Sequence, residues 1–105
     1  MKSVIHKLDC LVQEWASHQR SEVSGQFGCV AHHIIGRANQ YLRFDKDNLF
    51  VCTPQEHDAI HRGLLDVKDF ISEERAERLR KKKIDSLLFK PSDEFYKKCI
   101  ISWRL

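Results

Sequence analysis

The chain has 105 residues, a formal net charge of +3 and a hydrophobic content of 42%. This length suits a single domain with a small core, and the apolar content argues against an intrinsically disordered chain. No apolar run approaches the roughly 20 residues that span a bilayer, and no secretory signal pattern opens the chain, so we expect a cytoplasmic protein with no membrane partner.

The cysteines are scattered along the chain. Cys10, Cys29, Cys52 and Cys99 form no C-x-x-C pair, so the sequence contains neither a zinc ribbon nor a redox motif of that kind. We expect reduced, partly buried thiols, as is usual in the cytoplasm.

The first twenty residues are predicted to form a packing helix. Their apolar side chains recur at three- and four-residue intervals, which places them on one face: Val4, Ile5, Leu8, Leu11, Val12, Trp15 and Ala16. Residues 21–28 are rich in serine and glycine and are predicted to be a connection. The segment from Phe27 to Ile35 is short, apolar and partly β-branched, which favours a first strand.

A second strand and a helix are predicted after a polar loop over residues 36–47. Leu49 to Cys52 is a brief apolar run, and Thr53-Pro54 is typical of an N-cap followed by the first position of a helix. That helix would end near Gly63, a residue suited to a C-terminal stop. The predicted order is therefore strand, loop, strand and helix within residues 27–63.

Two further helices are predicted over residues 72–105. Ser72 is a suitable N-cap for a helix that reaches Leu88, with acidic residues in its first turn and lysines towards its end. Lys90-Pro91 interrupts the pattern, and Ser92 begins the last helix. We therefore expect one α+β domain over residues 1–105, with helices on both sides of the central segment.

Four of the six histidines lie between positions 32 and 61. His57 and His61 are four residues apart, a spacing that brings their Cβ atoms to roughly 5–6 Å on one helix face and allows them to share a metal ion. In the adjacent pair His32-His33, one imidazole can complete a metal site while its neighbour faces a substrate and takes a proton. Neighbours on a regular strand point to opposite faces, so we expect the metal on one side of this pair and the base on the other, unless the strand ends here.

Three segments together resemble the HNH motif of endonucleases, in the version found in colicin-type nuclease domains. They are Ala31–Ile35 with its His-His pair, Arg43–Leu49 with D-x-D-N, and Val51–Gly63 with Thr-Pro and H-x-x-x-H-R-G. The resemblance covers about residues 29–63. It implies a ββα-metal hairpin and helix, with His32, His57 and His61 as metal ligands, His33 as general base and Asn48 as the central asparagine that ties the loop.

The same resemblance implies a metal-dependent DNA endonuclease with one divalent ion, for which Mg²⁺, Mn²⁺, Ni²⁺ and Zn²⁺ are the candidates. We expect it to nick DNA with little sequence specificity, in a phage or mobile-element setting, and a homodimer would supply two sites. Basic side chains flank the motif and crowd residues 75–83, where they suit phosphate contacts. The candidates for contact with DNA are Arg37, Arg62, Arg78, Lys81 and Lys82.

Two other classes of function remain open from the residues. In the first, Cys29 joins His32, His57 and His61 in a closed structural zinc site. Residues three apart on an extended strand lie about 10 Å apart, which disfavours that set. In the second, the chain is a non-catalytic DNA-binding or assembly module.

Overall fold

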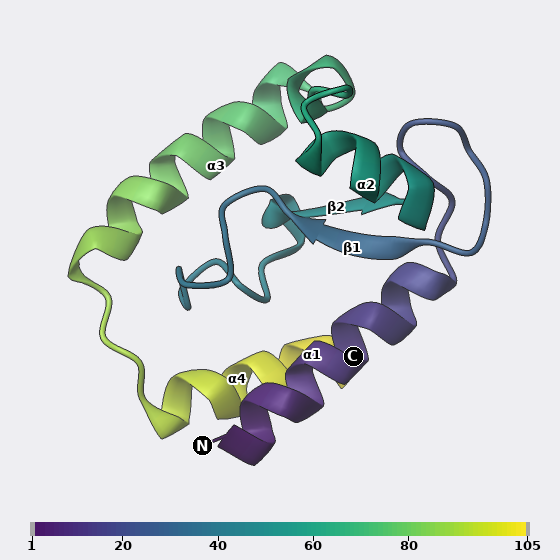
Figure 1. Cartoon of the computed structure of the whole chain (residues 1–105). Helices are drawn as coiled ribbons and strands as arrows, with labels where there is room; N and C mark the ends of the chain where they lie inside the picture. The colour runs from purple at the N-terminus through teal and green to yellow at the C-terminus, as the bar shows by residue number, and fades with distance from the viewer. Residues whose placement is uncertain (1, 105) are drawn as a thin grey trace.

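A computed structural model describes residues 2–104 and confirms a small α+β domain (Figure 1). The two strands and four helices follow in the order α1 (Lys2–Ser17), β1 (Val30–His33), β2 (Leu49–Cys52), α2 (Pro54–His61), α3 (Glu73–Asp85) and α4 (Asp93–Arg104). Short 3₁₀ turns precede β2 and flank α3: η1 (Lys46–Asn48), η2 (Val67–Asp69) and η3 (Ser86–Leu88). Within the described range, no helix is long and apolar enough to cross a membrane.

The two strands form an antiparallel pair in which Ala31 lies opposite Val51 and His33 lies opposite Leu49. β2 is buried along its whole length, which agrees with the apolar run from which it is predicted. β1 is shorter than the predicted strand from Phe27 to Ile35. Gly28 has a φ of +79°, a conformation that interrupts a strand before it begins, and the chain bends immediately after His33.

The N-terminal helix buries the stripe that its spacing predicts. Leu8, Val12 and Ala16 face the main core, and α1 packs beside α4 at the bottom of the molecule (Figure 1). Trp15 of α1 meets Trp103 of α4 edge to face, with ring centroids 5.5 Å apart. The helix ends at Ser17, three residues before the predicted end, and residue 1 lies outside the described range.

The short helix α2 begins and ends where its sequence signals lie. The Thr53 side chain accepts a hydrogen bond from the Glu56 backbone N–H, and the Glu56 carboxylate accepts one from the Thr53 N–H, which completes a capping box. Pro54 occupies the first turn. Gly63, with a φ of +74°, follows the helix and allows the chain to turn away.

The helix α3 is attached to the domain by a largely buried arginine. The Arg75 guanidinium donates to the backbone oxygens of Asp47 and Leu49, each at 2.9 Å, and binds Glu22 at 2.6 Å. Ser72 caps the helix by accepting from the Arg75 N–H, as predicted. Regular α-helix ends at Asp85, and the last three residues of the predicted helix form η3.

Candidate functional site

Three histidines from β1 and α2 converge on one point. His57 and His61 lie one turn apart on α2, and their Nε2 atoms are 3.1 Å apart. The centroid of the His32 ring, near the end of β1, lies 5.1 Å from the ring centroid of His57 and 5.3 Å from that of His61. One nitrogen from each of the three lies within 4.8 Å of the other two, so the group can hold a metal ion.

The donor set fits a divalent transition metal. Nitrogen ligands at 2.0–2.1 Å in a tetrahedral arrangement lie roughly 3.3 Å from one another, close to the observed spacing of the His57 and His61 nitrogens. Three imidazoles leave a fourth position for water or substrate, which is typical of a catalytic rather than a closed site.

Partial burial keeps His32 and His57 in their neutral form, the form that binds metal. Desolvation, with smaller effects from His57 and His61, lowers the pKa of His32 to about 4. Desolvation and the neighbouring His61 also lower the pKa of His57. The two rings therefore have free lone pairs at neutral pH.

The neighbouring histidine of β1 is held differently. His33 Nε2 lies 3.0 Å from the backbone oxygen of Arg43, and since a carbonyl only accepts, the ring must donate from Nε2. This tautomer leaves Nδ1 as the acceptor. Burial lowers the pKa of His33, against the opposing effect of the Arg43 carbonyl, so Nδ1 is available to take a proton at pH 7.

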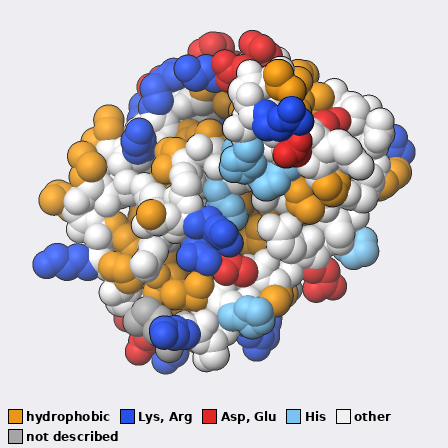
Figure 2. All heavy atoms as spheres, in the orientation of Figure 1, with side chains coloured by type: hydrophobic (Ala, Val, Ile, Leu, Met, Phe, Trp, Pro, Cys, Tyr) orange, Lys and Arg blue, Asp and Glu red, His pale blue; other side chains and the backbone are white. Residues whose placement is uncertain are grey.

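His32 and His33 reach the same cavity, although a regular strand would separate them. The cavity has a volume of about 300 Å³ and is lined by Gln13, Ala31, His32, His33, Gly36, Arg37, His57 and His61. The strand ends at His33 and the chain bends there, which is the exception that the sequence left open. Figure 2 shows pale-blue histidine side chains together at the surface over α2, with basic side chains above and below them.

Asn48, the central asparagine of the resemblance, is fully buried. Its side-chain oxygen accepts from the Ile35 N–H at 2.7 Å, and its amide nitrogen donates to the backbone oxygens of Ile35 and Leu42 at 3.0 and 3.1 Å. Asn48 is not among the residues that line the cavity. It ties together the two ends of the loop that carries the Arg43 carbonyl.

Sequence reasoning missed two residues of α1 that support the site. Asp9 binds the Arg43 side chain through both carboxylate oxygens, at 2.6 and 3.1 Å. Gln13 accepts from the Ala31 N–H at 3.1 Å and lines the cavity. Both lie outside the segment that resembles a motif, and only their place on the polar side of a helix distinguishes them.

The basic candidates for phosphate contact have different surroundings. Arg37 lines the histidine cavity and Lys81 is exposed, whereas the exposed Arg62 pairs with Asp58 at 3.4 Å. The remaining two candidates, Arg78 and Lys82, bind acidic side chains at the turn before β2. Arg78 binds Asp47 at 3.0 Å, and Lys82 lies 2.9 Å from carboxylate oxygens of Asp45 and Asp47.

Cys29, the fourth ligand of the alternative zinc site, is not among the convergent side chains of residues 2–104. Its thiol donates to the Gln26 backbone oxygen at 3.3 Å, and burial raises its pKa. Desolvation also raises the pKa of Cys52 to about 12, so this thiol stays protonated.

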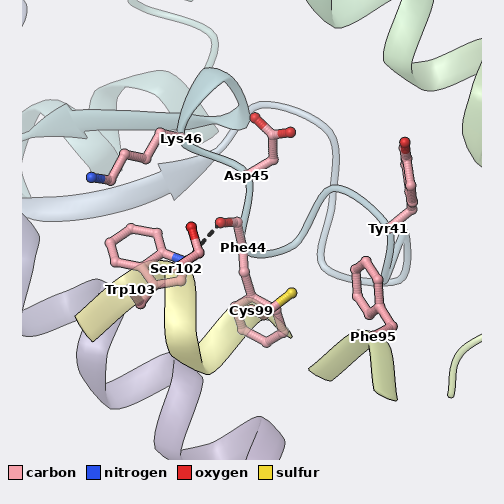
Figure 3. Close-up of a pocket in the computed structure, with 8 residues that line it drawn as sticks. All are labelled: Tyr41, Phe44, Asp45, Lys46, Phe95, Cys99, Ser102 and Trp103. Atoms are coloured by element: carbon pink, nitrogen blue, oxygen red, sulfur yellow. Dashed lines mark hydrogen bonds between the residues drawn. The ribbon is translucent and has the colours of Figure 1, made fainter. Parts of the chain in front are cut away.

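A separate cavity of about 410 Å³ lies between α4 and the loop before β2 (Figure 3). Half of the residues that line it are aromatic: Tyr41, Phe44, Phe95 and Trp103. The Trp103 indole donates to the Phe44 backbone oxygen across it at 2.9 Å. None of the convergent histidines lines this cavity, so it is distinct from the candidate site.

Comparison with known proteins identifies no relative. No family model matches the chain, and neither the curated proteins nor the solved structures searched contain a match.

Proposed function

We propose that this protein is a metal-dependent DNA endonuclease of the HNH type, in which β1, β2 and α2 form a ββα-metal site. One observation carries the proposal. Three imidazoles that can hold an ion open into the same cavity as a fourth imidazole whose tautomer is set for proton abstraction.

The roles divide between the two sets of histidines. His32, His57 and His61 would hold a divalent ion, with Mg²⁺, Mn²⁺, Ni²⁺ and Zn²⁺ as the candidates. When bound, such an ion would stabilise negative charge on the phosphate oxygens and on the leaving 3′-oxygen. His33 would take a proton from the attacking water at Nδ1, which leaves 5′-phosphate and 3′-hydroxyl ends. A positioned base of this kind contributes typically ~10²–10⁴-fold to a rate.

Residues that do not contact the substrate hold the proposed base in its orientation. Asn48 fixes the Leu42 carbonyl, Asp9 fixes the Arg43 side chain, and the Arg43 carbonyl between these anchors accepts from His33. A ring held at one nitrogen by a fixed acceptor keeps both its tautomer and its orientation. We therefore assign Asp9 and Asn48 as positioning residues.

Substrate contact would fall first to Arg37, which lines the cavity, and then to the exposed Arg62 and Lys81. Arg78 and Lys82 would have to exchange their ion pairs with Asp47 and Asp45 for phosphate. Contacts to phosphate position DNA but do not read its sequence, which supports nicking with little specificity, as in a phage or mobile element. One site cuts one strand, so cleavage of both requires two copies or two events.

The test is incubation of the purified protein with supercoiled plasmid in Mg²⁺, Mn²⁺, Ni²⁺ or Zn²⁺, with and without EDTA. We expect metal-dependent nicking that falls by at least ~10²-fold in His33→Ala, the lower limit for loss of a base. His18→Ala, which removes an exposed histidine outside the cavity, should cleave like the wild type.

Two results would count against the proposal. A wild-type protein that is inert with every metal would exclude nuclease activity. If Zn²⁺ then raised the thermal stability without cleavage, the chain would be a zinc-stabilised DNA-binding or assembly module instead.

A further inference from the structure

Large apolar side chains lie exposed where α3 runs into η3. Ile84, Leu87 and Leu88 leave 67%, 78% and 92% of their surfaces accessible to water. Figure 2 shows hydrophobic side chains along the left edge of the molecule, where Figure 1 places the end of α3. Neighbouring exposed apolar residues of this size mark interaction surfaces on soluble proteins.

A groove of about 290 Å³ runs along the same side of α3, beside these residues. Its apolar walls come from Ile34, Ile35, Ile71, Ala76 and Leu79. Lys83 also lines it, and the exposed Leu87 follows four residues later, in η3. The helix thus presents a protruding apolar end and an apolar depression near its start.

Exposed residues along this side follow a seam with alternating spacings of four and three. They are Glu73, Glu77, Arg80, Ile84 and Leu87, which we call the α3 stripe. From Glu73 to Ile84 this spacing places side chains on one face of α3, as in the contact seam of a coiled coil, and Leu87 follows in η3. The stripe is acidic in its first half, basic at its centre and apolar at its end.

We propose that the α3 stripe is a two-fold interface with a second copy of this chain. Two antiparallel α3 helices, with the symmetry axis between residues 78 and 79, bring Glu77 of one copy opposite Arg80 of the second copy. Each Glu73 then meets the Ile84 of the other helix. A symmetric contact of this kind uses the same patch on both molecules.

The residues beside the stripe agree with the same arrangement. Glu74 and Lys81 lie on one flank of it, and in an antiparallel pair residues of the same flank meet, which places opposite charges together. Leu87 reaches the Ile71 end of the groove on the other molecule. Like charges would instead face each other in a parallel pair, at both Glu77 and Arg80.

Other partners fit this surface less well. A nucleic acid would meet two carboxylates and two large apolar groups on the stripe, whereas its phosphates require cations. An anionic membrane surface would be repelled by the same carboxylates. A second copy pairs the carboxylate of Glu77 with the guanidinium of Arg80 and covers Ile84, which neither of the other partners does.

A seam formed by one helix of each molecule is short. It buries less than the ~800 Å² per partner of a standard interface, so we expect a weak, concentration-dependent dimer. The molecular mass in solution reports the dimer whether or not the chain cleaves DNA. The inference can therefore fail independently of the proposed nuclease function.

The test is sedimentation equilibrium of the full chain without DNA, from about 10 μM to about 1 mM, which spans weak affinities. We expect a reversible monomer–dimer equilibrium that Ile84→Ser weakens at least tenfold. Ile84 is already exposed, so this change should leave the monomer folded, as circular dichroism would verify. Ile101→Ser removes an isoleucine of similar exposure, 61%, from α4 and should leave the equilibrium unchanged.

A charge exchange tests the antiparallel register itself. Arg80→Glu should weaken the dimer at least tenfold, because two carboxylates then face each other across the interface. The double variant Glu77→Arg with Arg80→Glu restores opposite charges both across the interface and within each helix, where the two residues already pair at 2.5 Å. It should dimerise nearly as well as the wild type.

Two outcomes would overturn the inference. One is a wild-type protein that stays monomeric over the whole concentration range. The other is a dimer that survives Ile84→Ser and Arg80→Glu unchanged, since its interface must then lie elsewhere.

Discussion

Both carboxylate oxygens of Asp9, on α1, accept hydrogen bonds from the guanidinium of Arg43, at 2.6 and 3.1 Å. The two residues are 34 positions apart in the sequence. The carbonyl of the same arginine accepts the hydrogen bond of His33. The N-terminal helix therefore takes part in fixing the proposed base, although it contributes no group to the chemistry.

Replacement of Asp9 by asparagine should lower kcat more than it changes KM. The amide keeps the size of the carboxylate but loses the charge that holds Arg43, so the His33 ring gains freedom. We expect a loss of roughly tenfold in kcat, or about 1.4 kcal/mol of transition-state stabilisation, from kinetics on plasmid DNA. Glu14→Gln, which changes an exposed carboxylate of α1, should have no effect. An equal loss in both variants would contradict the positioning role.

Replacement of Asn48 by alanine should destabilise the whole domain. The side chain is fully buried and makes three hydrogen bonds to backbone groups, and its removal takes away the side-chain partner of both the N–H and the carbonyl of Ile35. We expect a loss of about 2–4 kcal/mol in the free energy of unfolding, measured in urea. A change below about 0.5 kcal/mol would show that the loop does not depend on this brace.

Metal should stabilise the folded chain through the three convergent histidines. An ion at 100 times its dissociation constant adds about 2.7 kcal/mol when it binds only the native state. We therefore expect Ni²⁺ or Mn²⁺ to raise the melting temperature, and EDTA to reverse the rise. His57→Ala should abolish the effect, whereas His18→Ala should retain it. A rise that persists in His57→Ala would place the ion at another site.

Acid should remove the stabilising contribution of Asp47. Hydrogen bonds from Arg78, aided by Lys82, hold the pKa of this carboxyl at about 2, below the ~3.9 expected in the unfolded chain. The unfolded state therefore binds more protons between these values, and stability falls as pH drops through this range. The full contribution is present above about pH 5. We expect about 1–2 kcal/mol, discounted because Arg78 is half exposed.

The measurement for Asp47 is the free energy of unfolding from pH 7 to pH 2 in the wild type and in Asp47→Asn. The two curves should differ most near neutral pH and approach each other at pH 2. Parallel curves would mean that the ion pairs contribute nothing.

Local signals in the sequence predicted the central part of the fold well. Thr53-Pro54 and Gly63 set the bounds of α2, and the four-residue spacing of His57 and His61 predicted their shared face. These features depend on neighbours within one helical turn, so a single sequence contains the necessary information. The first strand was predicted too long, because the left-handed conformation of Gly28 is not visible in an apolar run.

Contacts between distant segments could not be predicted in the same way. The link from Asp9 to Arg43 depends on how α1 packs, and a polar residue on an amphipathic helix looks solvated from sequence alone. Arg78 and Lys82 were predicted to contact phosphate as part of a basic run. The structure pairs them with acidic residues more than 30 positions earlier, and charge patterning within one segment does not show such partners.

The helix that carries two of the convergent histidines is only eight residues long, and none of its residues is buried. Helices of this length are marginal alone, so α2 depends on its cap at Thr53 and on what its last turn touches. His57 lies at the middle of α2 and His61 is its last residue, and both rings approach His32 of β1. An ion held there would act as a cross-link between helix and strand, and would suppress local fraying of α2. Order in the cavity and occupancy of the metal site would then rise and fall together.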